Sequence, residues 1–253
     1  MNNLSVVILT KNAQATISAA VDSALLVTHE VIVVDSGSAD NTLKIAEQQG
    51  ARVICIQWKG YGDARNSGAA EATNAYILNI DADEVITEQL AESINQLQPE
   101  AKTIYGFKRM NYLGTKEIKH GEWSNDRVWR LYNKNETRWN LSEVHEKLDG
   151  GGFRKTMLRG ALRHFTADSI ASYQKKMDGY ARLSAKKYRD QHKKIGWGKT
   201  LLSPLFNLVK NYIFRLGILD GKAGWDIAKA HFQYTRNKYL YLRRLKEGKP
   251  ETT

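Results

Sequence analysis

The stretch Ala75-Tyr76-Ile77-Leu78-Asn79-Ile80-Asp81-Ala82-Asp83-Glu84 decides the fold of this chain, because an apolar run ends there in three carboxylates. The run 75–80 has the length and composition of a buried strand. Ionised carboxylates are costly to bury without partners, so Asp81, Asp83 and Glu84 indicate a site at the strand end. Mg²⁺ and Mn²⁺ prefer oxygen ligands, and carboxylates spaced i, i+2 can share one ion with a substrate's phosphates. Taken alone, the same residues also fit a solvated acidic turn.

Strands and helices alternate around this stretch. The expected strands cover 4–9, 30–34, 52–56 and 75–80, and the expected helices include residues 17–25, 43–46 and about 63–72. This spacing is typical of parallel βαβ units. It predicts an α/β fold with a doubly wound, mainly parallel sheet and helices on both faces.

Polar residues stand where these strands end. Thr10-Lys11-Asn12, Asp35-Ser36-Gly37 and Asp81-Ala82-Asp83 each follow a buried run. Ligands of open α/β sheets bind beyond the carboxyl ends of the strands, so the three segments predict one shared site. The chain has no Gly-x-Gly-x-x-Gly after the first strand and no Gly-Lys-Ser/Thr loop, which argues against a dinucleotide-binding domain and a P-loop NTPase.

Composition limits the classes of protein that need to be considered. The chain has 253 residues, 42% of them hydrophobic, which is enough for a full core and argues against disorder. Its single cysteine, Cys55, excludes an internal disulfide and suits a reducing compartment. We expect no signal peptide, because the N-terminus lacks a charged region followed by an apolar stretch. We also expect no membrane-spanning segment, because no uninterrupted apolar run approaches 18 residues.

The net charge of +11 is unevenly distributed. Residues 1–152 hold 15 Lys and Arg against 20 Asp and Glu, whereas residues 153–253 hold 23 against 7. A basic C-terminal part implies an anionic partner, which can be nucleic acid, a membrane surface or an acidic acceptor. We therefore expect two regions, a catalytic domain at 1–165 and a basic, aromatic-rich helical region at 166–253.

Four motifs together carry a resemblance to a known family. They are Thr10-Lys11-Asn12, Val34-Asp35-Ser36-Gly37-Ser38-x-Asp40-Asn41-Thr42, Gly62-x-x-Arg65-Asn66 and Asp81-Ala82-Asp83-Glu84. In this order and spacing the chain resembles family 2 glycosyltransferases of the GT-A fold, and most of all the bacterial lipopolysaccharide inner-core β-1,4-glucosyltransferases. The resemblance implies an inverting, metal-dependent transfer of glucose from UDP-glucose to a heptose of the lipid A–core.

The resemblance also assigns donor-side roles. It implies that the nucleotide is held by Thr10, Asn12, Asp35, Ser36, Arg65, Asn66 and Asp81, and that Asp83, with Asp81, binds Mn²⁺ or Mg²⁺. Each assignment has a plainer alternative. Asp35 is also suited to a helix-capping turn, and Arg65 to a surface pair with Glu71 or Asp63.

A second cluster, Ser142-Glu143-Val144-His145-Glu146, offers a base for the acceptor hydroxyl. The resemblance places the base of an inverting enzyme here. Glu146 is our first candidate and Glu143 the second, although the common Glu-Asp pair is replaced by His-Glu. Either carboxylate can instead be an exposed strand residue. His164 follows a late strand and is expected to complete the metal shell; the alternative is a hydrogen-bonded core histidine.

Basic residues on two later strands are expected on the acceptor side. Lys108, Arg127 and Arg130 suit a phosphorylated acceptor, although Arg127 and Arg130 also fit an ordinary solvated strand face. The polar segment 113–123 between these strands is expected to be a mobile acceptor-side loop.

The C-terminal part has helical periodicity, with apolar and basic residues interleaved. Residues 199–219 are apolar enough to lie in a membrane interface and too interrupted to span a bilayer. We expect a peripheral protein on the cytoplasmic face of the bacterial inner membrane, with anionic lipid as a partner. The alternatives are a family 2 enzyme with a capsule, polysaccharide or polypeptide acceptor, a sugar-1-phosphate nucleotidyltransferase, and a nucleic-acid-binding protein. The last two lack their signatures, and no nucleic acid is expected.

Overall fold

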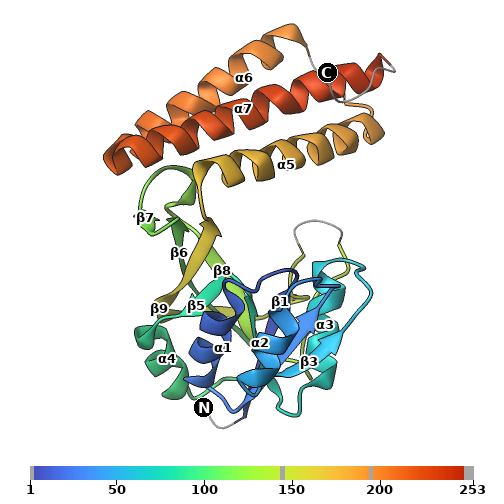
Figure 1. Ribbon diagram of the computed structural model, residues 1–253, viewed down its shortest axis with the longest axis vertical. Coiled ribbons are helices and arrows are strands. Elements are labelled where there is room, and N and C mark those ends of the chain that lie inside the picture. Colours follow the sequence, from blue (N-terminus) through green and yellow to red (C-terminus); the bar gives the residue numbers. More distant parts are fainter. Residues whose placement is uncertain (1–2, 143–145, 194–195, 248–253) are drawn as a thin grey trace. The chain divides into compact units, whose positions relative to one another are not determined.

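A computed structural model describes residues 3–142, 146–193 and 196–247 (Figure 1). The chain forms two compact units. The sheet unit comprises residues 1–109 and 126–164, and the helical unit comprises residues 110–125 and 165–253. This division differs from the expected boundary at 165/166, because residues 110–125 belong with the C-terminal region.

The first four strands are parallel, in the order β3-β2-β1-β4. They are β1 (Leu4–Thr10), β2 (Glu30–Asp35), β3 (Arg52–Cys55) and β4 (Tyr76–Asp81), joined by α1 (Ile17–Leu25), α2 (Thr42–Gln48) and α3 (Tyr61–Glu71). In the sheet register Thr10 is paired with Asp35, and Leu9 with Asp81. The carboxyl ends of β1, β2 and β4 therefore lie side by side, as the sequence predicted.

The remaining strands make the sheet mixed. β8 (Arg127–Asn133) runs antiparallel to β4 and is followed by β6 (Thr103–Leu113), β9 (Arg154–Ala167) and β5 (Glu84–Ile86), while β7 (Lys116–Ile118) pairs with β6. The GT-A type of α/β fold is confirmed, but its parallel character is confined to the first half. The antiparallel half brings β8 and β9 to the end of β4.

Both faces of the parallel strands are buried, which explains their uninterrupted apolar sequences. Val6, Ile8, Val31 and Val33 pack in one cluster with apolar residues of α1, α2 and α4 (Glu88–Asn95). The alternate residues of β1 and β2 pack in a second cluster with Ala64 and Ala69 of α3. The helices thus cover both sides of the sheet, as expected for a doubly wound fold.

The helical unit contains α5 (Ile170–Asp190), α6 (Trp197–Val209), a π-helical turn η2 (Lys210–Phe214), η3 (Gly217–Asp220) and α7 (Gly221–Lys246). Its core includes Ile118, Trp123, Tyr173 and Ile227. The prediction that residues 113–123 form a mobile acceptor-side loop is therefore wrong. This segment forms β7 and the 3₁₀ turn η1 (Gly121–Trp123), and its apolar residues are buried in this core.

Candidate active site at the carboxyl ends of β1, β2 and β4

Asp81 and Glu84 lie in a chain of ion pairs rather than in open solvent. Arg65 Nη2 and Arg130 Nη2 each donate to one oxygen of Asp81, at 3.0 Å and 2.9 Å. Arg130 Nη1 and Arg109 Nη1 donate to the two oxygens of Glu84, at 2.7 Å and 3.0 Å. The amide of Asp81 also donates to Glu84. Glu84 is completely buried, and these partners compensate its charge.

The arginines determine the protonation of Asp81. Burial by itself raises the pKa of this carboxyl, but the positive charges of Arg130 and Arg65 outweigh burial and hold the pKa well below its usual range. Asp81 is therefore a carboxylate at neutral pH. Both oxygens of Asp81 are bound by arginines, whereas the sequence led us to expect that they bind a metal ion and the nucleotide.

Arg65 is buried instead of lying open to a pyrophosphate. Its guanidinium stacks on the Trp139 ring at 5.0 Å from the centroid, and its Nε lies 3.7 Å from Oε1 of Glu146. Nε and Nη1 are enclosed and have no hydrogen-bond partner among the described residues. Arg65 thus lies between Asp81 and Glu146 and is in ion-pair range of both.

Asn66 also contacts protein where a ribose contact was expected. Its Nδ2 donates to the carbonyl of Trp139 at 2.8 Å, and its Oδ1 accepts from the amide of Trp139 at 3.0 Å. Trp139 Nε1 in turn donates to Asn79 Oδ1 of β4 at 2.8 Å. A Cβ at Gly62 would lie 2.0 Å from the Asn140 carbonyl oxygen, so glycine permits this close approach. Helix α3 therefore clamps the segment that leads to Glu146.

Of the two candidate bases, the structure describes Glu146 alone, because Glu143 lies outside the described residues. The Glu146 side chain is partly exposed, at 18%, beside the guanidinium of Arg65. A carboxylate in this position can reach solvent or a bound molecule and still be held in place by an ion pair.

Asp83 and His164 come together although 81 positions separate them in the sequence. β5 pairs with β9 so that Glu84 is opposite His164, and His164 Nε2 lies 3.4 Å from Oδ2 of Asp83. One carboxylate oxygen and one imidazole nitrogen at this separation fit a shared Mn²⁺ or Mg²⁺ whose other ligands are substrate oxygens and water. Within the described ranges, no group of three or more His, Cys, Asp or Glu side chains could hold a metal by itself.

The ends of β1 and β2 form a compact polar loop. Asp35 is buried and accepts from the amides of Gly37 and Ser38, so its hydrogen bonds are those of the turn that was the alternative interpretation. The Ser36 hydroxyl donates to the Thr10 carbonyl at 3.3 Å, and Asn12 Oδ1 accepts from the amide of Ala39 at 2.8 Å. The Thr10 hydroxyl is buried with no partner among the described residues.

The three basic residues expected on the acceptor side have different environments. Lys108 and Arg127 are exposed and directly opposite each other on β6 and β8. Arg130 is buried and binds Asp81 and Glu84, so it is not available to an acceptor, contrary to expectation. Burial lowers the pKa of its guanidinium, but the two carboxylates more than compensate, and the net shift is upward.

Sequence reasoning missed several residues of this site. It left Glu84 without a role, and it assigned none to Arg109, Trp139 or Asn79. An asparagine inside an otherwise apolar strand, as at position 79, is the signal that could have been followed, because a buried amide needs a partner.

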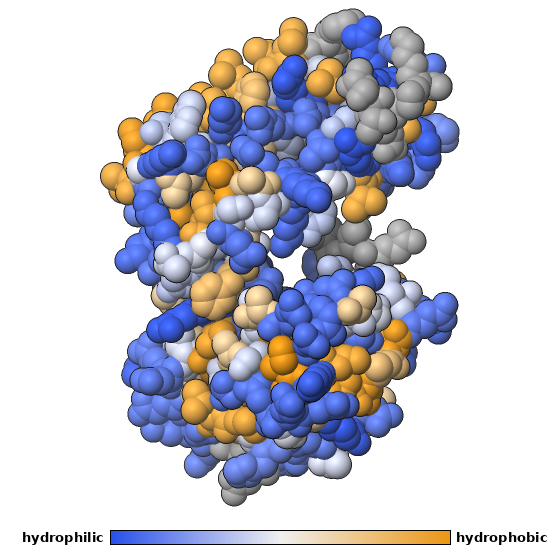
Figure 2. Space-filling model, in the orientation of Figure 1, coloured by the Kyte–Doolittle hydropathy of each residue, from blue (hydrophilic) through white to orange (hydrophobic). Residues whose placement is uncertain are grey.

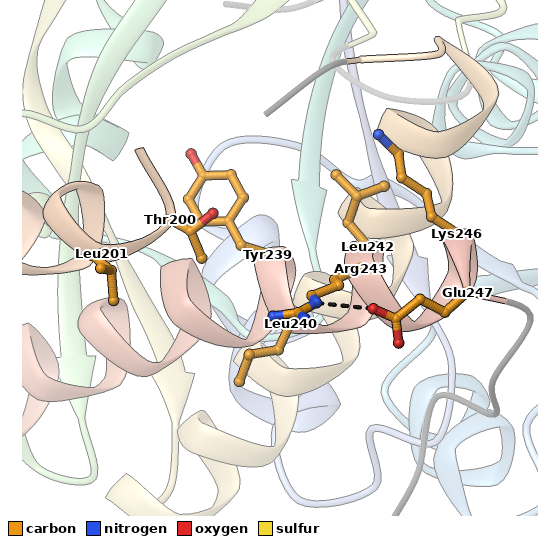
Figure 3. A pocket seen from close by; sticks show the side chains of 8 residues that line it. All are labelled: Thr200, Leu201, Tyr239, Leu240, Leu242, Arg243, Lys246 and Glu247. Atoms are coloured by element: carbon orange, nitrogen blue, oxygen red, sulfur yellow. Dashed lines mark hydrogen bonds and ion pairs between the residues drawn. The ribbon is translucent and has the colours of Figure 1, made fainter. Parts of the chain in front are cut away.

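A cavity of about 340 Å³ lies elsewhere, between α6 and α7 of the helical unit (Figure 3). Its walls include Leu201, Tyr239 and Leu242, with Arg243 and Lys246 also lining it. None of the described residues that were predicted for the donor, the metal or the base lines this cavity.

Polar residues gathered where three parallel strands end are typical of an α/β enzyme that binds its ligand at this edge of the sheet. The sequence model described as Glycosyl transferase family 2 matches residues 5–178, and the chain belongs to this family.

Several known proteins are similar to the chain. An uncharacterized glycosyltransferase of Rickettsia felis is 29% identical over 98% of this chain and 91% of its own length. The lipopolysaccharide core biosynthesis glycosyltransferase LpsC of Rhizobium meliloti is 26% identical, over 75% and 73%. WfaP of Escherichia coli, a UDP-Glc:α-D-GlcNAc-diphosphoundecaprenol β-1,3-glucosyltransferase, is 33% identical over 40% and 43%. The solved glucosyl-3-phosphoglycerate synthase of Mycobacterium tuberculosis, in complex with Mn²⁺, UDP and glucosyl-3-phosphoglycerate, is 27% identical over 44% of each chain, with a TM-score of 0.36.

Proposed function

We propose that this glycosyltransferase moves glucose from UDP-glucose to a heptose of the lipopolysaccharide inner core, with inversion at the anomeric carbon. Two contacts beyond the end of β4 carry the proposal: His164 lies against Asp83, and Glu146 lies beside Arg65, which also binds Asp81. Two relatives support the finer assignments. WfaP is named for UDP-glucose, and LpsC for lipopolysaccharide core biosynthesis.

Glu146 would accept the proton of the acceptor hydroxyl. The oxygen then forms a bond to C1 of glucose from the face opposite to UDP, while the bond from C1 to the phosphate oxygen breaks. One attack from the opposite face inverts the anomeric centre. Arg65 orients Glu146, and the clamp of Asn66 on Trp139 keeps the segment of the base against α3.

Asp83 and His164 would hold Mn²⁺ or Mg²⁺. A divalent ion there would neutralise the pyrophosphate charge that develops as UDP departs. Asp81 and Glu84 would act on this site indirectly, because their ion pairs fix the turn on which Asp83 lies. Thr10, Asn12, Asp35 and Ser36 would form the wall for uracil and ribose.

Lys108 and Arg127 would face the acceptor. Like charges directly opposite each other on adjacent strands are unfavourable unless an anion lies between them or beside them. Phosphate groups on an inner-core acceptor would supply that negative charge. Because such an acceptor is carried by a lipid, the enzyme would act as a peripheral protein at the cytoplasmic face of the inner membrane.

The test measures UDP release and transfer with several UDP-sugars, with and without Mn²⁺ or Mg²⁺. We expect Asp83→Ala to reduce metal-dependent turnover at least about a hundredfold and to remove the effect of Mn²⁺ on UDP affinity in calorimetry. Asp190→Ala, an exposed carboxylate of α5, is the matched control and should behave like the wild type.

Glu146→Gln in the same assay should retain UDP-sugar binding but lose transfer by about 10² to 10⁴. Transfer at the normal rate in this variant, with loss in Glu143→Gln, would assign the base to Glu143. Lack of both turnover and metal-dependent nucleotide binding in the wild type would refute the mechanism. Turnover with a capsule, polysaccharide or polypeptide acceptor in place of core heptose would refute the proposed acceptor but not the proposed reaction.

A further inference from the structure

Helix α6 differs from an ordinary surface helix in that polar residues face inward and large apolar residues are exposed. Asn207 Nδ2 donates to Thr235 Oγ1 of α7 at 2.9 Å, and Asn211 Nδ2 donates to Asn207 Oδ1 at 2.6 Å. Asn211 is 1% exposed, and Thr235 is buried as well. The opposite face carries Leu202 and Phe206, which are 66% and 64% exposed.

This outward face continues beyond α6. We define the apolar surface as the large hydrophobic residues that are exposed from α6 to the second turn of α7: Leu201, Leu202, Leu205, Phe206, Ile213, Phe214, Leu216, Ile218, Leu219 and Trp225. Figure 2 shows hydrophobic residues gathered along α6, at the upper edge of this view. A contiguous apolar patch of this kind is uncommon on a protein surface that faces only water.

An ordinary amphipathic helix turns its apolar stripe to the core, because burial of apolar area is the main stabilising term. Here Asn207 of α6 and Asn211 of η2 instead point inward and are satisfied by side-chain hydrogen bonds between amides and a hydroxyl. The large apolar side chains can therefore leave water only by contact with something outside this unit.

The charge around the apolar surface indicates the chemistry of that contact. Lys199, Lys210 and Lys222 lie among its residues in the sequence, the first and last exposed and Lys210 half-buried, and Arg215 pairs with Glu122. Asp220 is the single acidic residue in the sequence from 197 to 225; it is buried and accepts from the amide of His120 at 2.8 Å. The region 165–253 as a whole has 19 Lys and Arg against 7 Asp and Glu, so a second copy of this chain would be repelled.

We propose that the apolar surface lies in the headgroup region of an anionic lipid bilayer, with Phe206 and Phe214 inserted and the three lysines at the phosphates. Apolar insertion combined with basic residues is the pattern of helices that lie in the membrane plane. Among the residues that the structure describes, no helix is both long and apolar enough to cross a bilayer. The proposal specifies the surface for the membrane partner given under the proposed function and rests on it.

The experiment measures sedimentation of the full chain with phosphatidylcholine vesicles, with and without phosphatidylglycerol, in the absence of donor and acceptor. We expect binding to the anionic vesicles only. The double variant Phe206→Ser/Phe214→Ser should bind at least about tenfold more weakly, because two aromatic side chains no longer insert. The matched control is Leu183→Ser on α5, which is 62% exposed but lies outside the apolar surface; it should bind like the wild type.

A second variant tests the charge. Replacing Lys199, Lys210 and Lys222 by Gln should weaken binding to anionic vesicles by about fivefold for each lysine. Circular dichroism and UDP binding, which should match those of the wild type, show that each variant is folded.

Several results would overturn the proposal: equal binding to neutral vesicles, no effect of the phenylalanine changes, or an equal loss in Leu183→Ser. Self-association that the phenylalanine changes abolish, without vesicle binding, would assign the surface to a second copy instead. Because vesicle binding needs no turnover, it can succeed or fail independently of the proposed reaction.

Discussion

Arg130 holds two carboxylates at once and is the residue on which the acidic turn depends most. Its two terminal nitrogens bind Asp81 and Glu84, and Glu84 has no contact with solvent. Removing one partner of a buried ion pair leaves a charge uncompensated, which is far more costly than loss of a surface pair.

We therefore expect Arg130→Gln to lower the free energy of unfolding by about 3–5 kcal/mol, measured by urea denaturation. Arg127→Gln on the same strand removes an exposed charge and should change stability by less than about 0.5 kcal/mol. Equal effects of the two substitutions would show that the buried cluster is not a stabilising unit.

Arg130→Gln should also alter the dependence of stability on pH. The arginines lower the pKa of Asp81 in the folded state below its unfolded value, which is about 3.9. Asp81 thus stabilises the fold fully above the unfolded pKa, and this contribution is lost as pH falls towards the folded pKa. In Arg130→Gln, stability should fall less steeply below about pH 4.

At the scale of elements, α3 matters because it packs close to the sheet while it positions Arg65 and Asn66. A Cβ at Gly68 would lie 2.4 Å from Val7 Cγ1 and 2.7 Å from Val34 Cγ2, so glycine allows this close packing. The helix has little apolar character of its own, and small residues are what let it approach β1 and β2.

Gly68→Ala should destabilise the protein by about 1–3 kcal/mol through overpacking, and should also reduce kcat by shifting the clamp on Trp139. The comparison is Gly179→Ala in α5, where an added Cβ meets nothing within 4 Å; it should stabilise by about 0.5–1 kcal/mol. Thermal unfolding and a turnover assay measure both effects. Wild-type turnover in Gly68→Ala would contradict the positioning role of α3.

At the scale of the whole molecule, charge is divided along the chain. The first 152 residues are acidic overall and the rest are strongly basic. The excess of basic residues favours long-range attraction to an anionic surface without contributing to the fold itself.

We expect the effect of salt to distinguish binding to anionic vesicles from binding of UDP. Raising ionic strength from about 0.05 M to about 0.5 M should weaken binding to anionic vesicles strongly, since the Debye length falls below about 10 Å. UDP affinity, determined in the same buffers by calorimetry, should change much less, because the residues proposed for the donor lie in the sheet unit and not on the basic helices. A parallel fall of both affinities would indicate one shared anion site.

The parallel half of the sheet was predictable from the sequence because its signal is local. Strands 4–9, 30–34 and 75–80 are buried on both faces, so each reads as an unbroken apolar run, and the polar residues that end them share one sheet edge. The antiparallel half was less predictable, because β8 and β9 reach the end of β4 through contacts between residues distant in sequence.

By itself, the sequence determined the α/β class and the polar strand ends that share one edge of the sheet, and it supplied the candidates Asp83, His164 and Glu146. Only the tertiary structure decided that Glu84 is buried, that Arg130 serves the carboxylates rather than an acceptor, and that α6 turns its apolar face outward. The physical reason is the same in each case. An ionic or amide side chain takes its role from the partner that meets it in space, and Arg109, Arg130 and Thr235 come from strands and helices far along the chain.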